Sequence, residues 1–314
     1  MTKRLRAGAV VGTLGLAAAL SISPRAETPR PLVSVPVFVT DARGDSIRNL
    51  QAPEIEIAEG GTQQKISSLV FRGGAPRRVA IYLDEYHVSP GAGAERARGA
   101  LARFVERHLG PDDAVVVMKP LDPQSSTAPL ASVEAVHRAV ADFEGRRGNF
   151  EPRTEFEAQY MSVAPPSAGR QRAQVVRAGL ESLAIAMREG ADAARAMIVV
   201  TEGFRSSDPA TLRPTTLPTI ARAARLANVP VYILDPSAAS ADSPLDGAWA
   251  SMSEQTGGML FTGGADLDGA LARVAADLQS HYVVEFQGAG REDGGFHGID
   301  VRVTRRGARV RAAS

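Results

Sequence analysis

The sequence of 314 residues contains no cysteine. A chain without thiols forms no disulfide, carries no lipid anchor on a cysteine, and lacks the Cys–His spacing of structural zinc sites. A large excess of charge of either sign is also missing, because 36 basic and 35 acidic residues leave a formal net charge of +1. Steering toward nucleic acid or an anionic membrane requires a far larger imbalance. We therefore expect a fold stabilised by packing alone and no nucleic-acid partner.

No hydrophobic run is long enough for a stable membrane anchor. The apolar run Ala7–Leu20 is shorter than the roughly 20 residues that a membrane-spanning helix needs. Basic residues precede this run and small residues follow it, which is the order of a secretory signal. We predict that residues 1–26 are a signal peptide and that the mature protein is secreted or periplasmic, with no other segment inserted in a membrane. An uncleaved anchor is the alternative.

The two ends of the mature chain have the period-2 pattern of half-buried strands. Apolar and polar residues alternate from Val33 to Val39, and Pro36 within this run lacks an amide donor, which favours an edge strand. Neither terminal segment has enough strands to bury a face by itself. We predict that the N-terminal β segment, 31–75, pairs with the C-terminal β segment, 281–314, in one small sandwich.

Strands and helices alternate in the middle of the chain, from 78 to 280. This alternation is typical of βαβ units and a largely parallel sheet with helices on both faces. A short return strand is expected within 121–130, and Gly145–Gly169, rich in charge, Pro and Gly, has no predicted element and is a candidate functional loop. Helices are predicted at 95–108, 132–143, 170–188, 219–227, 246–255 and 266–278, and strands at 79–84, 114–119, 197–201, 229–235 and 259–262.

The ordered set of these segments resembles the von Willebrand factor A fold, and in particular the bacterial VWFA-related family of exported proteins. The resemblance is carried by Val79–Asp84, by Glu95–Leu109 with the strand that follows it, and by the closing strands Tyr282–Phe286 and Phe296–Val303. It implies an α/β fold: a von Willebrand factor A-like doubly wound, mostly parallel sheet over 78–280 with helices on both faces, flanked by the small β-sandwich of the terminal segments.

Domains of this fold commonly bind a divalent cation at a metal-ion-dependent adhesion site, whose first motif is Asp-x-Ser-x-Ser. This sequence keeps Asp84 but has Tyr86 and Val88 in place of the two serines, and Glu202 in place of the Asp after the fourth strand. Thr154 is the nearest candidate, by position only, for the loop threonine. The resemblance thus implies a degenerate site in which Asp84, Glu202 and Thr154 are the candidate oxygen ligands of Mg²⁺. No other cofactor is expected.

A protein partner is the predicted ligand of this end of the sheet. In open α/β sheets, ligands bind in the crevice outside the carboxyl ends of the strands. We predict a non-enzymatic interaction or adhesion module, with a Mg²⁺-dependent adhesion domain as the alternative. For Asp84, capping of local backbone amides is an equal alternative to ligand binding. The residues expected to bind the partner are Asp84, Tyr86, His87, Ser89, Glu202, Phe204 and Arg205.

A hydrolase that uses the same crevice is the second alternative. His87 and Ser89 are neighbours at a predicted strand end, and residues i and i+2 share a face on an extended chain. No third group orients the pair, and the sequence has no Gly-x-Ser-x-Gly nucleophile elbow. We therefore expect no enzyme.

Overall fold

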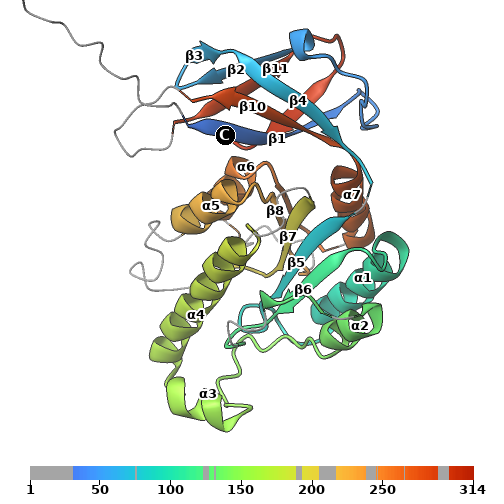
Figure 1. Cartoon of the computed structure of the whole chain (residues 1–314). Helices are drawn as coiled ribbons and strands as arrows, with labels where there is room; N and C mark the ends of the chain where they lie inside the picture. Colours follow the sequence, from blue (N-terminus) through green and yellow to red (C-terminus); the bar gives the residue numbers. More distant parts are fainter. Residues whose placement is uncertain are drawn as a thin grey trace, which may run out of the picture.

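Two bodies of secondary structure, an α/β body and a β-sandwich, make up the computed structural model (Figure 1). The structure describes residues 31–74, 76–122, 127–130, 132–188, 193–204, 217–237, 245, 247–264, 266–288 and 297–314. The predicted signal segment 1–26 and Arg205 lie outside these residues. None of the helices in the described part combines the length and apolar character needed to cross a membrane.

Five parallel strands form the centre of the α/β body, in the spatial order β6-β5-β7-β8-β9. They are apolar along most of their length because helices cover both faces of a parallel sheet. The strands are Arg77–Leu83 (β5), Ala114–Met118 (β6), Ala194–Val200 (β7), Val231–Leu234 (β8) and Met259–Phe261 (β9). The predicted α/β class and the largely parallel sheet are confirmed.

The helices form two layers, one on each face of this sheet. Successive strand residues point to opposite faces, so Ile81 of β5 packs in the layer of α1, α2 and α7, whereas Tyr82 packs in the layer of α4, α5 and α6. The helices are Ala92–His108 (α1), Val133–Ala141 (α2), Glu155–Tyr160 (α3), Pro165–Ala186 (α4), Leu217–Leu226 (α5), Gly247–Gln255 (α6) and Leu267–Gln279 (α7). The prediction of helices on both faces is confirmed.

The sandwich consists of two antiparallel sheets, and each of them combines strands from both ends of the chain. Their orders are β12-β1-β10-β4 and β11-β2-β3. Val37, Ile57 and Phe286 meet in one core between the sheets. The strands are Leu32–Thr40 (β1), Ile55–Glu59 (β2), Thr62–Gln64 (β3), Ile66–Arg72 (β4), His281–Gln287 (β10), Ile299–Val303 (β11) and Arg309–Ala312 (β12), with a short 3₁₀ turn at Ala52–Glu54 (η1). The predicted pairing of the terminal segments is confirmed.

Three local expectations need correction. β1 is not an edge strand, because it lies between β10 and β12. Pro36 stands opposite Val283 of β10, but pairing with β12 begins only at Val37. On the β12 side, therefore, the missing amide donor of Pro36 leaves no ladder hydrogen bond unmade. The described residues of 121–130 form no return strand, and only the Leu130 amide bonds back to β6. The segment Gly145–Gly169 is not one loop, since it contains α3 and the first turn of α4.

The sandwich and α3 lie at opposite ends of the molecule (Figure 1). β5 begins at Arg77, directly after the sandwich strand β4, so the amino ends of the parallel strands face the sandwich. The carboxyl ends therefore point toward the far end, where α3 lies. This is the end at which the fold class places its ligands.

Candidate functional site

Asp84 lies at the carboxyl end of β5 and accepts hydrogen bonds from the chain around it. The hydroxyl of Thr201, which follows β7, donates to Asp84 Oδ2 (2.7 Å). His87 Nδ1 lies 2.9 Å from both carboxylate oxygens, and the His87 amide donates to Oδ1 (3.2 Å). Asp84 has no exposed surface. Its carboxylate therefore joins the ends of two neighbouring strands to the turn after β5.

The Glu202 carboxylate is also fully engaged. It accepts the Ser89 amide at Oε1 (2.9 Å) and the Ser89 hydroxyl at Oε2 (2.7 Å). The Arg147 guanidinium lies 3.3 Å from Oε2 and also donates to the carbonyls of His87 and Gly203 (2.8 Å for Gly203). A cation supplied by the chain itself thus balances the Glu202 carboxylate.

A third buried carboxylate, Glu157 of α3, lies at the centre of a cationic cluster. The Tyr86 hydroxyl donates to Glu157 Oε1 (2.9 Å), and Arg146 Nη1 donates to both oxygens (3.0 and 3.1 Å). The Arg153 amide adds a further bond to Oε2 (2.8 Å). The Arg172 guanidinium lies 4.4 Å from the centroid of the Tyr86 ring. These contacts attach α3 to the turn after β5.

Protonation in this cluster follows from the same contacts. Burial alone would raise the pKa of Glu157, but hydrogen bonds from the Arg153 amide, Arg146 and Tyr86 outweigh it and hold that pKa below its usual value. Burial, followed by the Glu157 charge, raises the pKa of Tyr86 well above its ordinary range. At neutral pH, Glu157 is therefore an anion and Tyr86 a neutral donor.

Residues 145–154 lie directly on the turn after β5. A Cβ on Gly145 would meet the Ser89 carbonyl oxygen at 2.2 Å, so only glycine allows this close approach. The next two amides donate to the carbonyls of Glu85 (2.7 Å) and Val88 (2.9 Å). The segment thereby covers the crevice.

The residues predicted to bind a partner are brought together at this end, but most are buried. Ser89 is partly exposed. Phe204 packs edge-on against the His87 ring (4.7 Å between centroids) and against Trp249 (5.0 Å). The predicted residues with exposures between 0% and 9% are Asp84, Tyr86, His87, Glu202 and Phe204. A partner at this end therefore meets the covering segment first.

The exposed side chains of that segment are aromatic and aliphatic. Phe156 (53% exposed) and Tyr160 (56%) lie on α3 with ring centroids 4.6 Å apart, and Val163 (62%) follows. We define these three residues as the α3 patch. Sequence reasoning missed the patch, although Thr154 and Glu157 have the Thr-x-x-Glu spacing that marks a helix start.

No protein-family model matches the sequence, and no curated protein is significantly similar to it. Several solved structures, the following two among them, are similar in shape. The pilus adhesin SpaC from Lactobacillus rhamnosus GG, in its open conformation, has 10% identity and a TM-score of 0.40 over 84% of this chain and 44% of that chain. The manganese-loaded Plasmodium vivax TRAP protein has 9% identity and a TM-score of 0.40 over 76% of this chain and 97% of that chain. This chain thus spans less than half of the pilus adhesin, and at these values neither similarity bears on function.

The three candidate metal ligands do not fit a cation in this arrangement. Thr154 accepts the Glu157 amide (3.0 Å) and caps α3. Both oxygens of Asp84 and of Glu202 already accept hydrogen bonds from protein groups. Within the described ranges, no group of three or more His, Asp or Glu side chains is placed to hold a metal ion.

The candidate catalytic pair is also differently engaged. The Ser89 hydroxyl donates to Glu202, and His87 Nδ1 is held by Asp84. No hydrogen bond joins His87 to Ser89, both of which the structure describes. Activation of a serine requires its hydroxyl within hydrogen-bond reach of the base. The arrangement gives the hydrolase alternative no support.

Proposed function

We propose that this chain is an exported, non-enzymatic interaction module that docks a protein partner at the carboxyl end of its parallel sheet. The signal-like N-terminal segment supports export. The engaged carboxylates of the crevice support a scaffold role for the residues beneath the surface. The α3 patch supplies the contact surface.

One observation carries this proposal: in a chain with only 5% aromatic residues, two aromatic side chains in mutual contact are exposed on a rigidly attached helix. Glu157, between Phe156 and Tyr160, is 4% exposed and bound on several sides. Rigid aromatic side chains that stand on a fixed base are typical anchors of protein interfaces, because little conformational entropy is lost when they bind. The α3 patch is therefore preorganised for a partner.

The partner that fits this patch is a protein surface with an apolar hollow for the aromatic pair and a polar rim. Around the patch, Glu151, Arg153 and Glu155 are exposed and carry both signs of charge. Three apolar side chains are far smaller than the roughly 800 Å² per partner of a stable interface, so a polar rim must contribute. We propose a different protein, rather than a second copy of this chain, as that partner.

A metal bridge is not needed in this proposal. Arg147 supplies the positive charge beside Glu202, and the Asp84 oxygens are bound by Thr201 and His87. Adhesion through a coordinated cation requires an open coordination position for the partner's carboxylate. We therefore propose binding through the α3 patch that is independent of added divalent cations.

The decisive experiment compares the mature chain with the double variant Phe156→Ala, Tyr160→Ala in quantitative capture from the envelope fraction, with and without EDTA. Each hot-spot aromatic contributes about 2 kcal/mol, so the captured partner should bind the variant at least about 30-fold more weakly. EDTA should not change capture. The melting temperature should stay close to that of the parent, because both rings are exposed.

Ile185→Ala is the matched control, because Ile185 of α4 is also exposed (53%) but lies outside the α3 patch. This control should retain full binding. Equal capture by the double variant and the parent would refute the proposal. Capture that is lost in EDTA would favour the Mg²⁺-dependent alternative, and turnover of an ester or phosphate panel that is lost in His87→Ala would favour the enzyme.

A further inference from the structure

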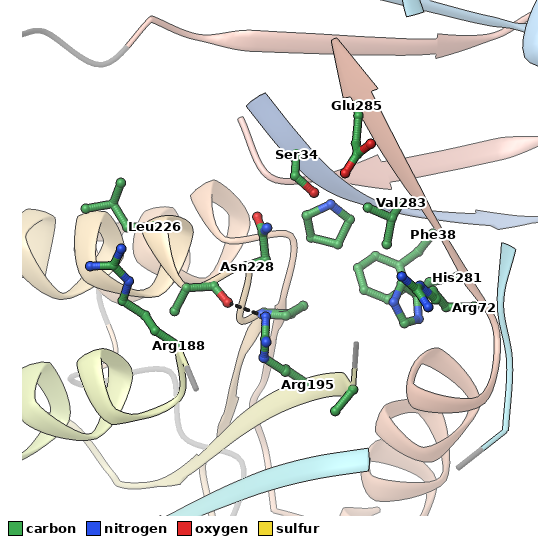
Figure 2. Close-up of a pocket in the computed structure, with 14 residues that line it drawn as sticks. Ser34, Phe38, Arg72, Arg188, Arg195, Leu226, Asn228, His281, Val283 and Glu285 are labelled. Carbon is green, nitrogen blue, oxygen red and sulfur yellow. Dashed lines mark hydrogen bonds between the residues drawn. The ribbon is translucent and has the colours of Figure 1, made fainter. Parts of the chain in front are cut away.

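A cavity of about 400 Å³ lies between the sandwich and the α/β body, at the amino ends of the parallel strands (Figure 2). One wall is the outer face of β1 and β10, with Ser34, Phe38 and Glu285. The other wall comes from the start of β7, with Arg195, and from the end of α5, with Asn228 following. This volume is within the range of small-molecule sites, which form preferentially at domain boundaries.

The lining of this cavity carries an excess of positive charge. Arg72 comes from β4, Arg188 from the chain after α4 and Arg195 from β7, whereas Glu285 is the only acidic side chain among the lining residues that the structure describes. Burial lowers the pKa of His281, a further titratable residue of the lining, and outweighs the hydrogen bond and charge of Asp277, which raise that pKa. The described part of the lining thus combines three permanent cations with one anion and a neutral imidazole.

The three guanidiniums reach the cavity from three separate elements. Figure 2 shows Arg188 and Arg195 on the side of the α/β body and Arg72 on the side of the sandwich, beside His281. Arg195 Nη1 donates to the Ala227 carbonyl (3.0 Å), which fixes its position. Arg188 is exposed, and its guanidinium forms no ion pair with any residue in the described ranges. Charges focused in a cleft between low-dielectric walls attract counterions strongly.

We propose that this cavity binds a small, multiply charged oxyanion, with phosphate or carboxylate groups held by Arg188, Arg195 and Arg72. Planar guanidiniums match such groups through paired N–H donors. Ser34 and Asn228 add neutral hydrogen-bonding groups, and Glu285 limits how many negative charges are accepted on the sandwich side. The site is separate from the α3 patch and does not depend on the proposed partner binding.

Isothermal titration calorimetry of the mature chain with pyrophosphate, with citrate and with inorganic phosphate tests this site. Pyrophosphate or citrate should bind saturably, with one ligand per chain and a dissociation constant below about 1 mM, and inorganic phosphate more weakly. The tighter of the two identifies phosphate or carboxylate as the preferred group. Bound ligand should also raise the melting temperature, because binding to the folded state alone stabilises it.

Arg188→Gln should weaken binding at least about tenfold, which is the contribution of one charged hydrogen bond. Because Arg188 is exposed, this variant should melt at the parent temperature in the absence of ligand. Glu285→Gln removes the negative charge and should tighten binding. The matched control is Arg306→Gln, an exposed arginine outside the cavity lining, which should bind like the parent.

Absence of saturable binding by all three anions would overturn the inference. Equal affinities for the parent, Arg188→Gln and Glu285→Gln would overturn it as well, because the ion would then bind elsewhere. Equal weakening by Arg188→Gln and Arg306→Gln would indicate nonspecific charge attraction and would also overturn it.

Discussion

Arg147 connects three segments of the crevice through one guanidinium. Its contacts are the Glu202 carboxylate (3.3 Å), the Gly203 carbonyl (2.8 Å) and the His87 carbonyl. Glu202 is 4% exposed, so its charge is largely removed from water. Removing one partner of a buried ion pair leaves the other desolvated and uncompensated. The compensation of the buried Glu202 charge therefore depends on this one guanidinium.

Arg147→Ala should lower the free energy of unfolding by about 3 kcal/mol, measured by urea denaturation, because Glu202 then remains buried without a cation. The control is Arg153→Ala. The Arg153 side chain is 42% exposed and pairs with Glu144 and Glu85, so its loss should cost less than about 1 kcal/mol. Equal losses in the two variants would contradict the special role of Arg147.

The short helix α3 is the element that carries the proposed binding surface. It runs over Glu155–Tyr160, too short to be stable in isolation. Its buried residue Glu157 holds it in place, because the carboxylate oxygens accept hydrogen bonds from Tyr86, Arg146 and the Arg153 amide. The Thr154 hydroxyl caps its first turn. Its position therefore depends on the charge of one carboxylate.

This dependence predicts a response to acid. The folded-state pKa of Glu157 lies below its usual value of 4.5, so its stabilising contribution is complete above about pH 4.5 and is lost as the pH falls through the folded-state pKa. Glu157→Gln should cost about 2 kcal/mol at pH 7. Between pH 5 and pH 3 its stability should fall less than that of the parent, as measured by urea denaturation at each pH.

Glu155→Gln is the comparison variant, because Glu155 lies on the same helix but is exposed. It should follow the parent at every pH. If Glu157→Gln and the parent lost equal stability between pH 5 and pH 3, Glu157 would not be the group that attaches α3.

Hydrophobic periodicity predicted the elements well, and it predicted the site only in part. Because parallel strands end at one edge, the proximity of Asp84 and Glu202 followed from the sequence. Their burial did not follow, and neither did α3. Charged residues such as Glu157, Arg146 and Arg172 count as exposed in any pattern, yet each is at most 4% exposed here. Only the folded structure shows that Glu157 lies beside both Arg146 and Arg172.

At the scale of the whole molecule, an ionic cluster joins the sandwich to the α/β body. Arg311 of β12 donates to the Asp277 carboxylate of α7 and to the Gly257 carbonyl (2.7 Å). Its guanidinium also lies 4.5 Å from the centroid of the Phe38 ring. The Tyr232 hydroxyl of β8 donates to the same carboxylate (2.9 Å). One arginine thus links the last strand to α7 and to the turn after α6 in the α/β body.

Arg311→Ala should lower the free energy of unfolding by about 3 kcal/mol, because Asp277 is 3% exposed and loses its nearest cation. Arg309→Ala is the matched control, since Arg309 lies on the same strand and is exposed. Its loss should change stability by less than about 0.5 kcal/mol in urea denaturation. Similar losses in both variants would show that β12 as a whole, not this cluster, joins the two bodies.

The pairing of β1 with β10 sets the order in which the protein can assemble. Val35 of β1 pairs with Val284 of β10, so the first strand of the sandwich gains this neighbour only after the entire α/β body has been synthesised. Until then its unpaired amides and carbonyls form an open template for other chains. Closing so long a loop is intrinsically slow. During synthesis the nascent protein must therefore keep its leading strand from aggregating, and a chain truncated before β10 would retain that hazard permanently.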